Sequence, residues 1–125
     1  MKMAKILIID DDNLFRGMLL DLLANKGHEI LEASDGQTGF ELFKKTNPNL
    51  VITDILMPEK EGMQTIREMR KESPDIKIIA LSGGGTHPEG LSYLEMALEL
   101  GANHSFPKPF KTKEFLQTVY ELTAQ

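Results

Sequence analysis

The sequence predicts an α/β fold in which helices cover both faces of a parallel sheet. Short apolar runs alternate with amphipathic stretches along the chain, and this alternation repeats five times. The first run, residues 6–9, is apolar at every position and rich in β-branched side chains, which is typical of a strand buried on both faces. Strands that alternate with helices pair in parallel through right-handed crossovers.

The first βα unit has a strand at residues 6–9 and a helix after it. Asp12 or Asn13 can cap this helix, and Gly27 can end it in a left-handed conformation. Its apolar residues recur at helical spacing and are Leu14, Phe15, Met18, Leu19, Leu22 and Leu23. A weaker strand candidate follows at residues 29–33.

The second helix and the third unit carry clear start and stop signals. Asp35 can cap the second helix, and Asn47-Pro48 stops it. The third strand is predicted at residues 50–53, and the helix after it ends at Ser73-Pro74. The apolar residues of these two helices are Phe40 and Phe43, then Met63, Ile66 and Met69.

The last two units follow the same pattern. We expect a strand at residues 76–81 and a helix that Gly101 closes, then a strand at residues 103–106 and a helix that Thr112 caps. The apolar residues of these helices are Leu91, Leu94 and Leu98, then Phe115, Leu116, Val119 and Leu122.

Composition narrows the class of protein. A length of 125 residues fits one domain, so we expect residues 1–125 to form a single domain without an effector domain. The net charge of −5 argues against direct nucleic-acid binding and against an anionic membrane surface. The absence of cysteine excludes disulfides and thiolate metal sites. We find no signal peptide or membrane span in the sequence, so the expected location is the cytoplasm.

Chemically suggestive side chains follow four of the five predicted strands. The carboxyl ends of parallel strands meet at one edge of the sheet, which is where such sheets bind ligands. We therefore expect these side chains to lie close together. In strand order they are Asp10, Asp11 and Asp12, then Asp54, then Ser82, and then Lys108.

This set of side chains suits phosphoryl transfer. Adjacent carboxylates repel each other unless a cation is present, and an oxygen-rich cluster that includes Asp54 suits Mg²⁺. A carboxylate can attack phosphorus and form an acyl phosphate. Lys108 could place positive charge beside the phosphoryl group, and Ser82 could hydrogen-bond one of its oxygens.

Each residue taken alone has a simpler interpretation. An aspartate after a strand is often a helix cap or a turn residue, and Asp12 fits that description. The joint occurrence at four strand ends favours the functional interpretation. The three histidines show no metal-ligand spacing and are interpreted as surface or loop residues: His28, His87 and His104.

Four segments resemble motifs of the receiver domain of two-component response regulators. Residues 6–12 resemble the family's first strand and acidic pair, and residues 54–58, with Gly62 following, resemble its phosphoacceptor motif. Residues 80–83 resemble the switch hydroxyl motif, and residues 108–110 resemble the lysine motif. The four motifs occur in the family's order and together span essentially the whole chain.

The resemblance implies a flavodoxin-like, doubly wound, five-stranded parallel sheet of order 2-1-3-4-5 with five helices. It implies that Asp54 accepts the phosphoryl group, that Lys108 contacts this group and that Ser82 reports its presence. Mg²⁺ would be the cofactor, held by Asp10, Asp11, Asp54 and the backbone carbonyl of Leu56. The bond between Lys108 and Pro109 is often cis in this family.

The implied function is signalling rather than enzymatic catalysis. A sensor histidine kinase or a phosphotransfer protein would donate the phosphoryl group, and the domain would assist its own phosphorylation and dephosphorylation. The surface of the fourth helix, fifth strand and fifth helix would then switch to control a downstream protein target. We expect a monomer or weak homodimer that contacts neither nucleic acid nor membrane, acting alone or as a piece of a longer regulator.

Two features depart from the family pattern. The segment from Ser82 to Lys108 is a few residues longer than usual, which affects the expected shape of the fourth helix. The residue three positions before the lysine is usually aromatic, and here it is Ser105. Phe106 is adjacent, but alternation along a strand points it to the opposite face.

Three other functions compete with this interpretation. An aspartyl-phosphate hydrolase would need a second aspartate at position 56, where this chain has leucine, and turnover of an external phosphoester would identify it. A flavin-binding module would need a phosphate loop and stacking aromatic residues, which we do not find. A degenerate receiver that acts by contact alone conflicts with the complete residue set, although Ser105 keeps it open.

Overall fold

The computed structural model describes residues 4–55, 62–83 and 92–124, and these form five strands and five helices. The strands are β1 (Lys5–Ile9), β2 (Glu29–Ala33), β3 (Leu50–Asp54), β4 (Lys77–Ser82) and β5 (His104–Pro107). The helices are α1 (Asn13–Ala24), α2 (Gly36–Thr46), α3 (Gly62–Glu72), α4 (Tyr93–Leu100) and α5 (Thr112–Thr123). All strand pairs are parallel, in the order β2-β1-β3-β4-β5, which confirms the predicted flavodoxin-like sheet.

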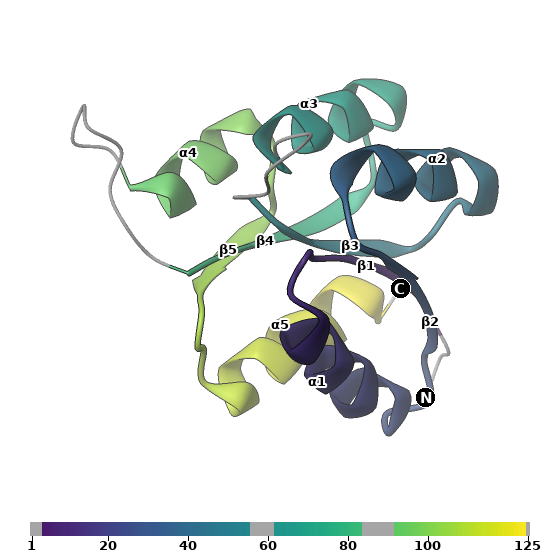
Figure 1. The fold of residues 1–125 in the computed structure, drawn as a ribbon, viewed down its shortest axis with the longest axis vertical. Helices are drawn as coiled ribbons and strands as arrows, with labels where there is room; N and C mark the ends of the chain where they lie inside the picture. The colour runs from purple at the N-terminus through teal and green to yellow at the C-terminus, as the bar shows by residue number, and fades with distance from the viewer. Residues whose placement is uncertain (1–3, 56–61, 84–91, 125) are drawn as a thin grey trace.

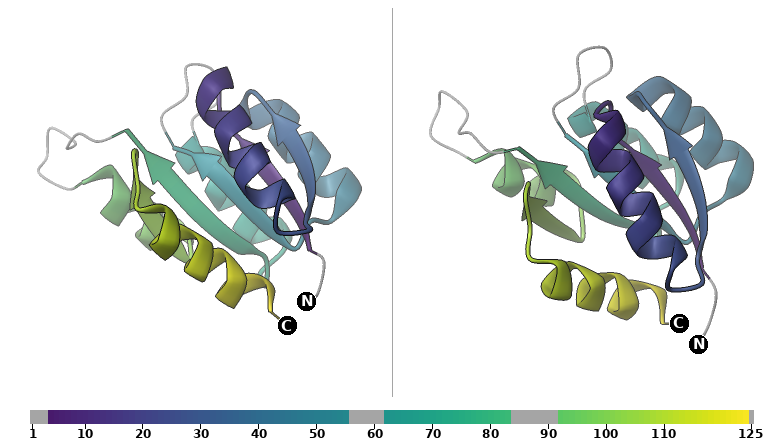
Figure 2. Two further views of the ribbon diagram at one scale, coloured as in Figure 1. Left: turned by 90° about the horizontal axis from the view of Figure 1, so that it is seen from below. Right: turned by 60° about the horizontal axis from the view of Figure 1, so that its bottom comes forward.

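The sheet separates two layers of helices. Figure 1 shows α1 and α5 on one face and α2, α3 and α4 on the other. The two views in Figure 2 show α1 and α5 lying side by side along their face of the sheet. None of the helices among the described residues is long and apolar enough to cross a membrane.

Each central strand contributes side chains to both layers, which explains why its sequence is mostly apolar. Leu7 and Ile9 of β1 pack into the cluster on the α2–α3–α4 side, whereas Ile6 and Ile8 pack into the cluster on the α1–α5 side. All five residues of β3 are buried. In the edge strand β2 only Ala33 is buried and the other four residues are exposed or half-buried, which accounts for its weaker sequence signal.

Side-chain caps begin α1 and α2 where the sequence indicates. The carboxylate of Asp12, not the side chain of Asn13, caps α1, because its Oδ1 accepts hydrogen bonds from the backbone N–H groups of Leu14 and Phe15 at 3.0 and 3.1 Å. Asp35 caps α2 in the same way. Asn47 then ends α2 in a left-handed conformation, with φ of 48°.

Several predicted boundaries move by a residue or more. Thr112 is the first helical residue of α5 and Lys111 takes the cap position without a side-chain cap, so the expectation that Thr112 caps this helix is wrong. Helix α1 ends at Ala24, and Gly27 adopts its positive φ of 87° in the turn that follows. In α4 the side chain of Leu98 is 46% exposed, and Leu91 lies outside the described residues.

Candidate functional site

Four of the predicted site residues lie at the carboxyl edge of adjacent strands. Asp10 directly follows β1, Asp54 ends β3, Ser82 ends β4 and Lys108 directly follows β5. Because the strand order places β1, β3, β4 and β5 next to one another, this edge brings the four residues together. Asp10, Asp54 and Ser82 are buried, with exposures of 0%, 5% and 1%.

The backbone of Asp10 is held from two sides. Its N–H donates to the carbonyl of Ala33 at 3.1 Å, which continues the pairing of β1 with β2. Its carbonyl accepts a hydrogen bond from the guanidinium of Arg16, which also forms an ion pair with Glu32. Asp10 therefore has a fixed position at the end of β1, and Arg16 is a supporting residue for which the sequence carried no signal.

The two carboxylate oxygens of Asp10 have different surroundings. Oδ1 accepts a hydrogen bond from the backbone N–H of Asp12 at 2.9 Å. Oδ2 is fully buried and receives no hydrogen bond of acceptable geometry within the described residues. Its close charged neighbour is Lys108 Nζ, 3.0 Å away. A buried carboxylate oxygen in this state is suited to a cation.

Lys108 reaches across the edge of the sheet to both buried carboxylates. Its Nζ lies 3.0 Å from Asp10 Oδ2 and donates to Asp54 Oδ2 at 3.5 Å. The ammonium also lies 4.4 Å from the ring centroid of Phe15 on α1. Its backbone N–H donates to the carbonyl of Ser82 at 2.7 Å, and the peptide bond to Pro109 is cis, as the resemblance implied.

The charge of Lys108 is stabilised by these carboxylates. Burial lowers the pKa of Lys108, but close contact with Asp10 and the charge of Asp54 raise it by more, so the pKa lies above its ordinary value. Lys108 is therefore a firmly protonated cation in front of Asp54 at neutral pH. Its side chain keeps 14% of its exposure, so it borders solvent.

The backbone around Asp54 is packed closely against the start of α3. A Cβ atom built on Gly62 would lie 2.1 Å from the carbonyl oxygen of Asp54 and 2.6 Å from Cα of Ile55. The same carbonyl accepts a hydrogen bond from Thr53 Oγ1 at 2.9 Å, and the N–H of Ile55 donates to Leu81. Only glycine fits at position 62, which gives the motif glycine a physical reason that the sequence did not supply.

Three carboxylates form a cluster that could hold a metal ion. Asp10, Asp11 and Asp54 each offer one oxygen, and these oxygens lie within 4.8 Å of one another. Asp11 is exposed, which leaves one side open to solvent. The expected fourth ligand, the carbonyl of Leu56, lies outside the described residues.

The hard oxygen donors and the buried Oδ2 of Asp10 therefore fit Mg²⁺. The cation would be held by Asp10, Asp11 and Asp54.

Ser105 and Phe106 lie on opposite faces of the sheet, as alternation predicts. Ser105 pairs with Ala80, which packs into the cluster on the α2–α3–α4 side. Phe106 packs on the other side, with its ring centroid 5.6 Å from that of Phe115 and 6.2 Å from that of Phe110. Phe106 is thus part of the α1–α5 core, and the position facing α4 carries a small hydroxyl side chain.

Comparison with known proteins identifies the family. The family model described as the response regulator receiver domain matches residues 6–120. The chain belongs to this family. Among curated relatives, this receiver domain is 43% identical over 110 residues to the probable transcriptional regulator ycf27 of Galdieria sulphuraria, covering 88% of the chain and 41% of that protein. It is 32% identical over 120 residues to the chemotaxis protein CheY of Thermotoga maritima, covering 95% of the chain and 97% of that protein.

Solved structures agree with this assignment. The receiver domain superposes on a response regulator receiver domain protein from Clostridium thermocellum with a TM-score of 0.87 and 30% identity, covering 98% of this chain and 95% of that one. It superposes on the chemotaxis protein CheY4 of Vibrio cholerae with a TM-score of 0.83 and 28% identity, covering 97% and 99%. The chain spans less than half the length of the ycf27 relatives, between 41% and 45% of the first three.

Proposed function

We propose that this receiver domain accepts a phosphoryl group on Asp54, in a reaction that requires Mg²⁺, from a sensor histidine kinase or a phosphotransfer protein. The observation that carries the proposal is the environment of Asp54. Its carboxylate lies 3.5 Å from the ammonium of Lys108 and within 4.8 Å of oxygens from Asp10 and Asp11. A nucleophile, a cation and a set of metal ligands are thus gathered around one buried carboxylate.

In the proposed reaction an oxygen of Asp54 attacks the phosphorus atom of a phosphohistidine. The new O–P bond forms as the N–P bond breaks, and the histidine nitrogen leaves with the electron pair. A Mg²⁺ ion bound at the cluster would neutralise charge on the phosphoryl oxygens. Lys108 supplies a second positive charge on the β5 side of Asp54, which stabilises the same oxygens. Dephosphorylation by water uses the same groups.

Phosphorylation also changes the partners of Lys108. In the unphosphorylated domain its ammonium pairs with Asp10 and Asp54. The phosphoryl group adds about 1.5 to 2 negative charges, which draws the ammonium towards its oxygens. Because the backbone of Lys108 is hydrogen-bonded to Ser82, β4 and β5 respond together. We propose that this response shifts the populations of the α4-β5-α5 surface and so controls a downstream protein.

The surface beside the site suits a protein donor. Leu14 and Met18, one turn apart on α1, are exposed by 88% and 46%. Leu14 follows the acidic run within one helical turn, so a partner that covers it also approaches Asp11. We propose that the phosphohistidine partner docks on this part of α1, because exposed large apolar side chains next to a reaction site favour protein contact.

Intact-protein mass after incubation with acetyl phosphate tests the proposal. We expect one added phosphoryl group in the presence of Mg²⁺, none in the presence of a chelator and none on Asp54→Asn. Asp21→Asn, an exposed carboxylate on α1 remote from the cluster, is the matched control and should be phosphorylated normally. Phosphorylation of Asp54→Asn at the normal rate would show that another residue is the acceptor.

A further inference from the structure

The guanidinium of Arg16 connects three parts of the chain beside the carboxylate cluster. Its Nη1 donates to the backbone carbonyl of Asp10, at the end of β1. Its Nε donates to Glu32 Oε1 on β2 at 3.1 Å, and its Nη2 donates to Asn13 Oδ1 in the first turn of α1 at 2.7 Å. Each nitrogen of the planar group has its own acceptor, and the side chain is only 15% exposed. The guanidinium is therefore held in one orientation.

The carbonyl that Arg16 contacts belongs to the peptide unit that joins two of the three cluster residues. Because a peptide unit is planar, the direction of the Asp10 carbonyl also fixes the direction in which the chain enters Asp11. The carboxylate of Asp11 is exposed and receives no hydrogen bond within the part of the chain that the structure describes. Its position thus depends on the backbone that carries it, and Arg16 holds that backbone.

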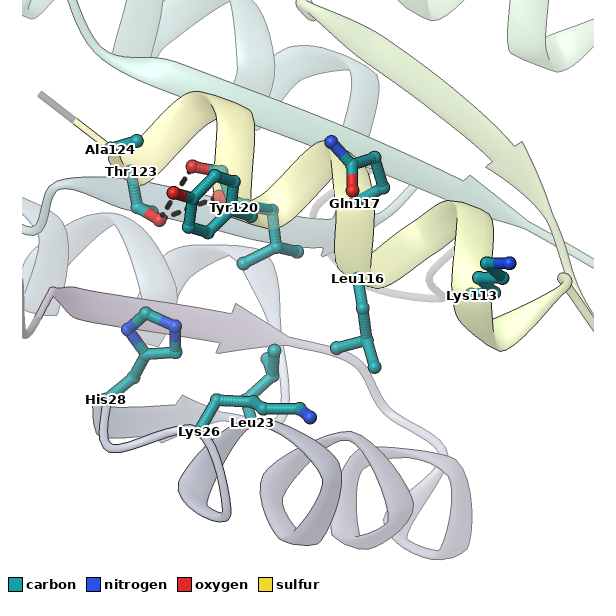
Figure 3. Close-up of a pocket in the computed structure, with 10 residues that line it drawn as sticks. Leu23, Lys26, His28, Lys113, Leu116, Gln117, Tyr120, Thr123 and Ala124 are labelled. Carbon is teal, nitrogen blue, oxygen red and sulfur yellow. Dashed lines mark hydrogen bonds between the residues drawn. The ribbon is translucent and has the colours of Figure 1, made fainter. Parts of the chain in front are cut away.

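Helix α1 gives Arg16 a rigid base. Leu19 and Leu23 are fully buried, and Figure 3 shows Leu23 pointing from α1 towards α5, where Leu116 points back towards it. At the start of the helix, the N–H of Arg16 donates to the carbonyl of the capping residue Asp12 at 2.9 Å. A side chain that extends from a packed helix can hold neighbouring groups in a fixed geometry.

We infer that Arg16 is a positioning residue for the proposed Mg²⁺ ligands Asp10 and Asp11, and that it acts by fixing the peptide between them rather than by its charge. The inference rests on the proposed function, because it takes Asp10, Asp11 and Asp54 as the residues that hold Mg²⁺. Loss of a hydrogen bond that orients metal ligands typically weakens metal binding by about 10–100-fold. Arg16 should therefore affect the affinity for Mg²⁺ without contacting the ion.

Positioning and charge predict opposite effects on Mg²⁺ binding. A positive charge beside a cation site repels the cation, so loss of the charge of Arg16 alone would strengthen binding. The ion pair with Glu32 already offsets part of this charge. Loss of the fixed peptide would weaken binding, because the ligands would then have to be ordered when the ion binds. The direction of the change in the dissociation constant therefore decides between the two roles.

Titration of the domain with MgCl₂, followed by amide shifts in two-dimensional ¹H–¹⁵N NMR, tests this inference. We expect Arg16→Met to raise the dissociation constant for Mg²⁺ about tenfold. Arg16→Lys keeps the charge but cannot fill three acceptors in the fixed geometry of a guanidinium, so it should also weaken binding, by less than Arg16→Met. The matched control Arg67→Met removes an exposed guanidinium on α3 and should bind Mg²⁺ like the native domain.

A double-mutant cycle tests whether the effect passes through Asp11. In the Asp11→Asn background, Arg16→Met should weaken Mg²⁺ binding by clearly less than it does in the native domain. Circular dichroism with a chelator present shows which variants are folded, and Arg16→Lys tests the inference even if Arg16→Met is not.

The inference is overturned if a folded Arg16 variant binds Mg²⁺ as tightly as the native domain or more tightly, or if the substitutions at positions 11 and 16 add independently. A native domain that binds no Mg²⁺ would overturn the metal site of the proposed function, and the inference with it. A native domain that binds Mg²⁺, with an unchanged dissociation constant in the Arg16 variants, overturns the inference alone.

Discussion

Replacing Lys108 with methionine removes the cation that lies between two buried carboxylates. Asp10 has no exposed surface and Asp54 has 5%, so neither can be fully solvated by a simple rotation. Methionine preserves most of the apolar stem and its packing near the Phe15 ring. The variant therefore changes charge more than volume, and its effect on stability reports the ion pairs.

The separations of 3.0 and 3.5 Å give attractions of about 5 kcal/mol each at an effective dielectric constant of about 20. Much of this attraction is offset by the cost of burying the charges. Removing one partner of a buried pair typically costs about 3–5 kcal/mol. Because Lys108 borders solvent and Asp11 leaves the cluster open on one side, we expect a loss at or just below this range, about 2–3 kcal/mol, without added divalent cation.

Urea unfolding followed by circular dichroism, in the presence of a chelator at pH 7.5, measures this loss. A double-mutant cycle with Asp10→Asn separates the pair from other effects of the methionine. In the Asp10→Asn background, Lys108→Met should cost about 1 kcal/mol or less. If the single variant is as stable as the native domain, or if the two substitutions add independently, the electrostatic account of the site is wrong.

Three further predictions follow from the same geometry. The pKa of Lys108 is raised in the folded domain, so the stabilisation by its charge is fully present below its ordinary pKa of about 10.5 and is lost as pH rises through the folded value. In urea titrations, the stability difference between the native domain and Lys108→Met should therefore be the same at pH 7 and 9 and should shrink above about pH 10.5. Gly62→Ala places a Cβ against the Asp54 carbonyl, so it should lower the free energy of unfolding by about 3 kcal/mol or more and slow labelling by acetyl phosphate. The control Gly17→Ala, which has open space around it on α1, should raise the free energy of unfolding by about 0.5–1 kcal/mol. Equal effects of the two substitutions would contradict the packing argument. Leu14→Ala should slow phosphoryl transfer from a histidine kinase several-fold and leave labelling by acetyl phosphate unchanged, and slowing of both would place Leu14 in the chemistry rather than in docking.

Strand positions could be predicted because burial on both faces leaves an unbroken apolar run, as in β1 and β3. Strand boundaries that depend on individual hydrogen bonds of the backbone or of side chains could not be predicted. The N–H of Ile76 turns back to the carbonyl of Ser73, so β4 begins one residue later than expected. The side chain of Asn103 accepts from the N–H of Ile78 and from Arg70, and β5 begins after it.

The residues of the candidate site were predictable because each directly follows or ends a strand, and topology alone brings those ends together. Their contacts were not predictable from pattern. The reach of Lys108 to Asp10 depends on the register of β5 against β4 and of β3 against β1, which no local sequence feature encodes. The close approach of Gly62 to the Asp54 carbonyl also depends on how α3 packs, as does the contact of Lys108 with Phe15 through α1.

Backbone hydrogen bonds extend the pairing of neighbouring strands into the site, and this limits which parts of the chain must be kept for the site to form. The N–H groups of Asp10, Ile55 and Lys108 donate to Ala33, Leu81 and Ser82, each on the neighbouring strand. The backbone that carries the reacting groups is thus anchored by the sheet. The sequence between one strand and the next can therefore change among homologues while the strand pairing keeps these residues in register.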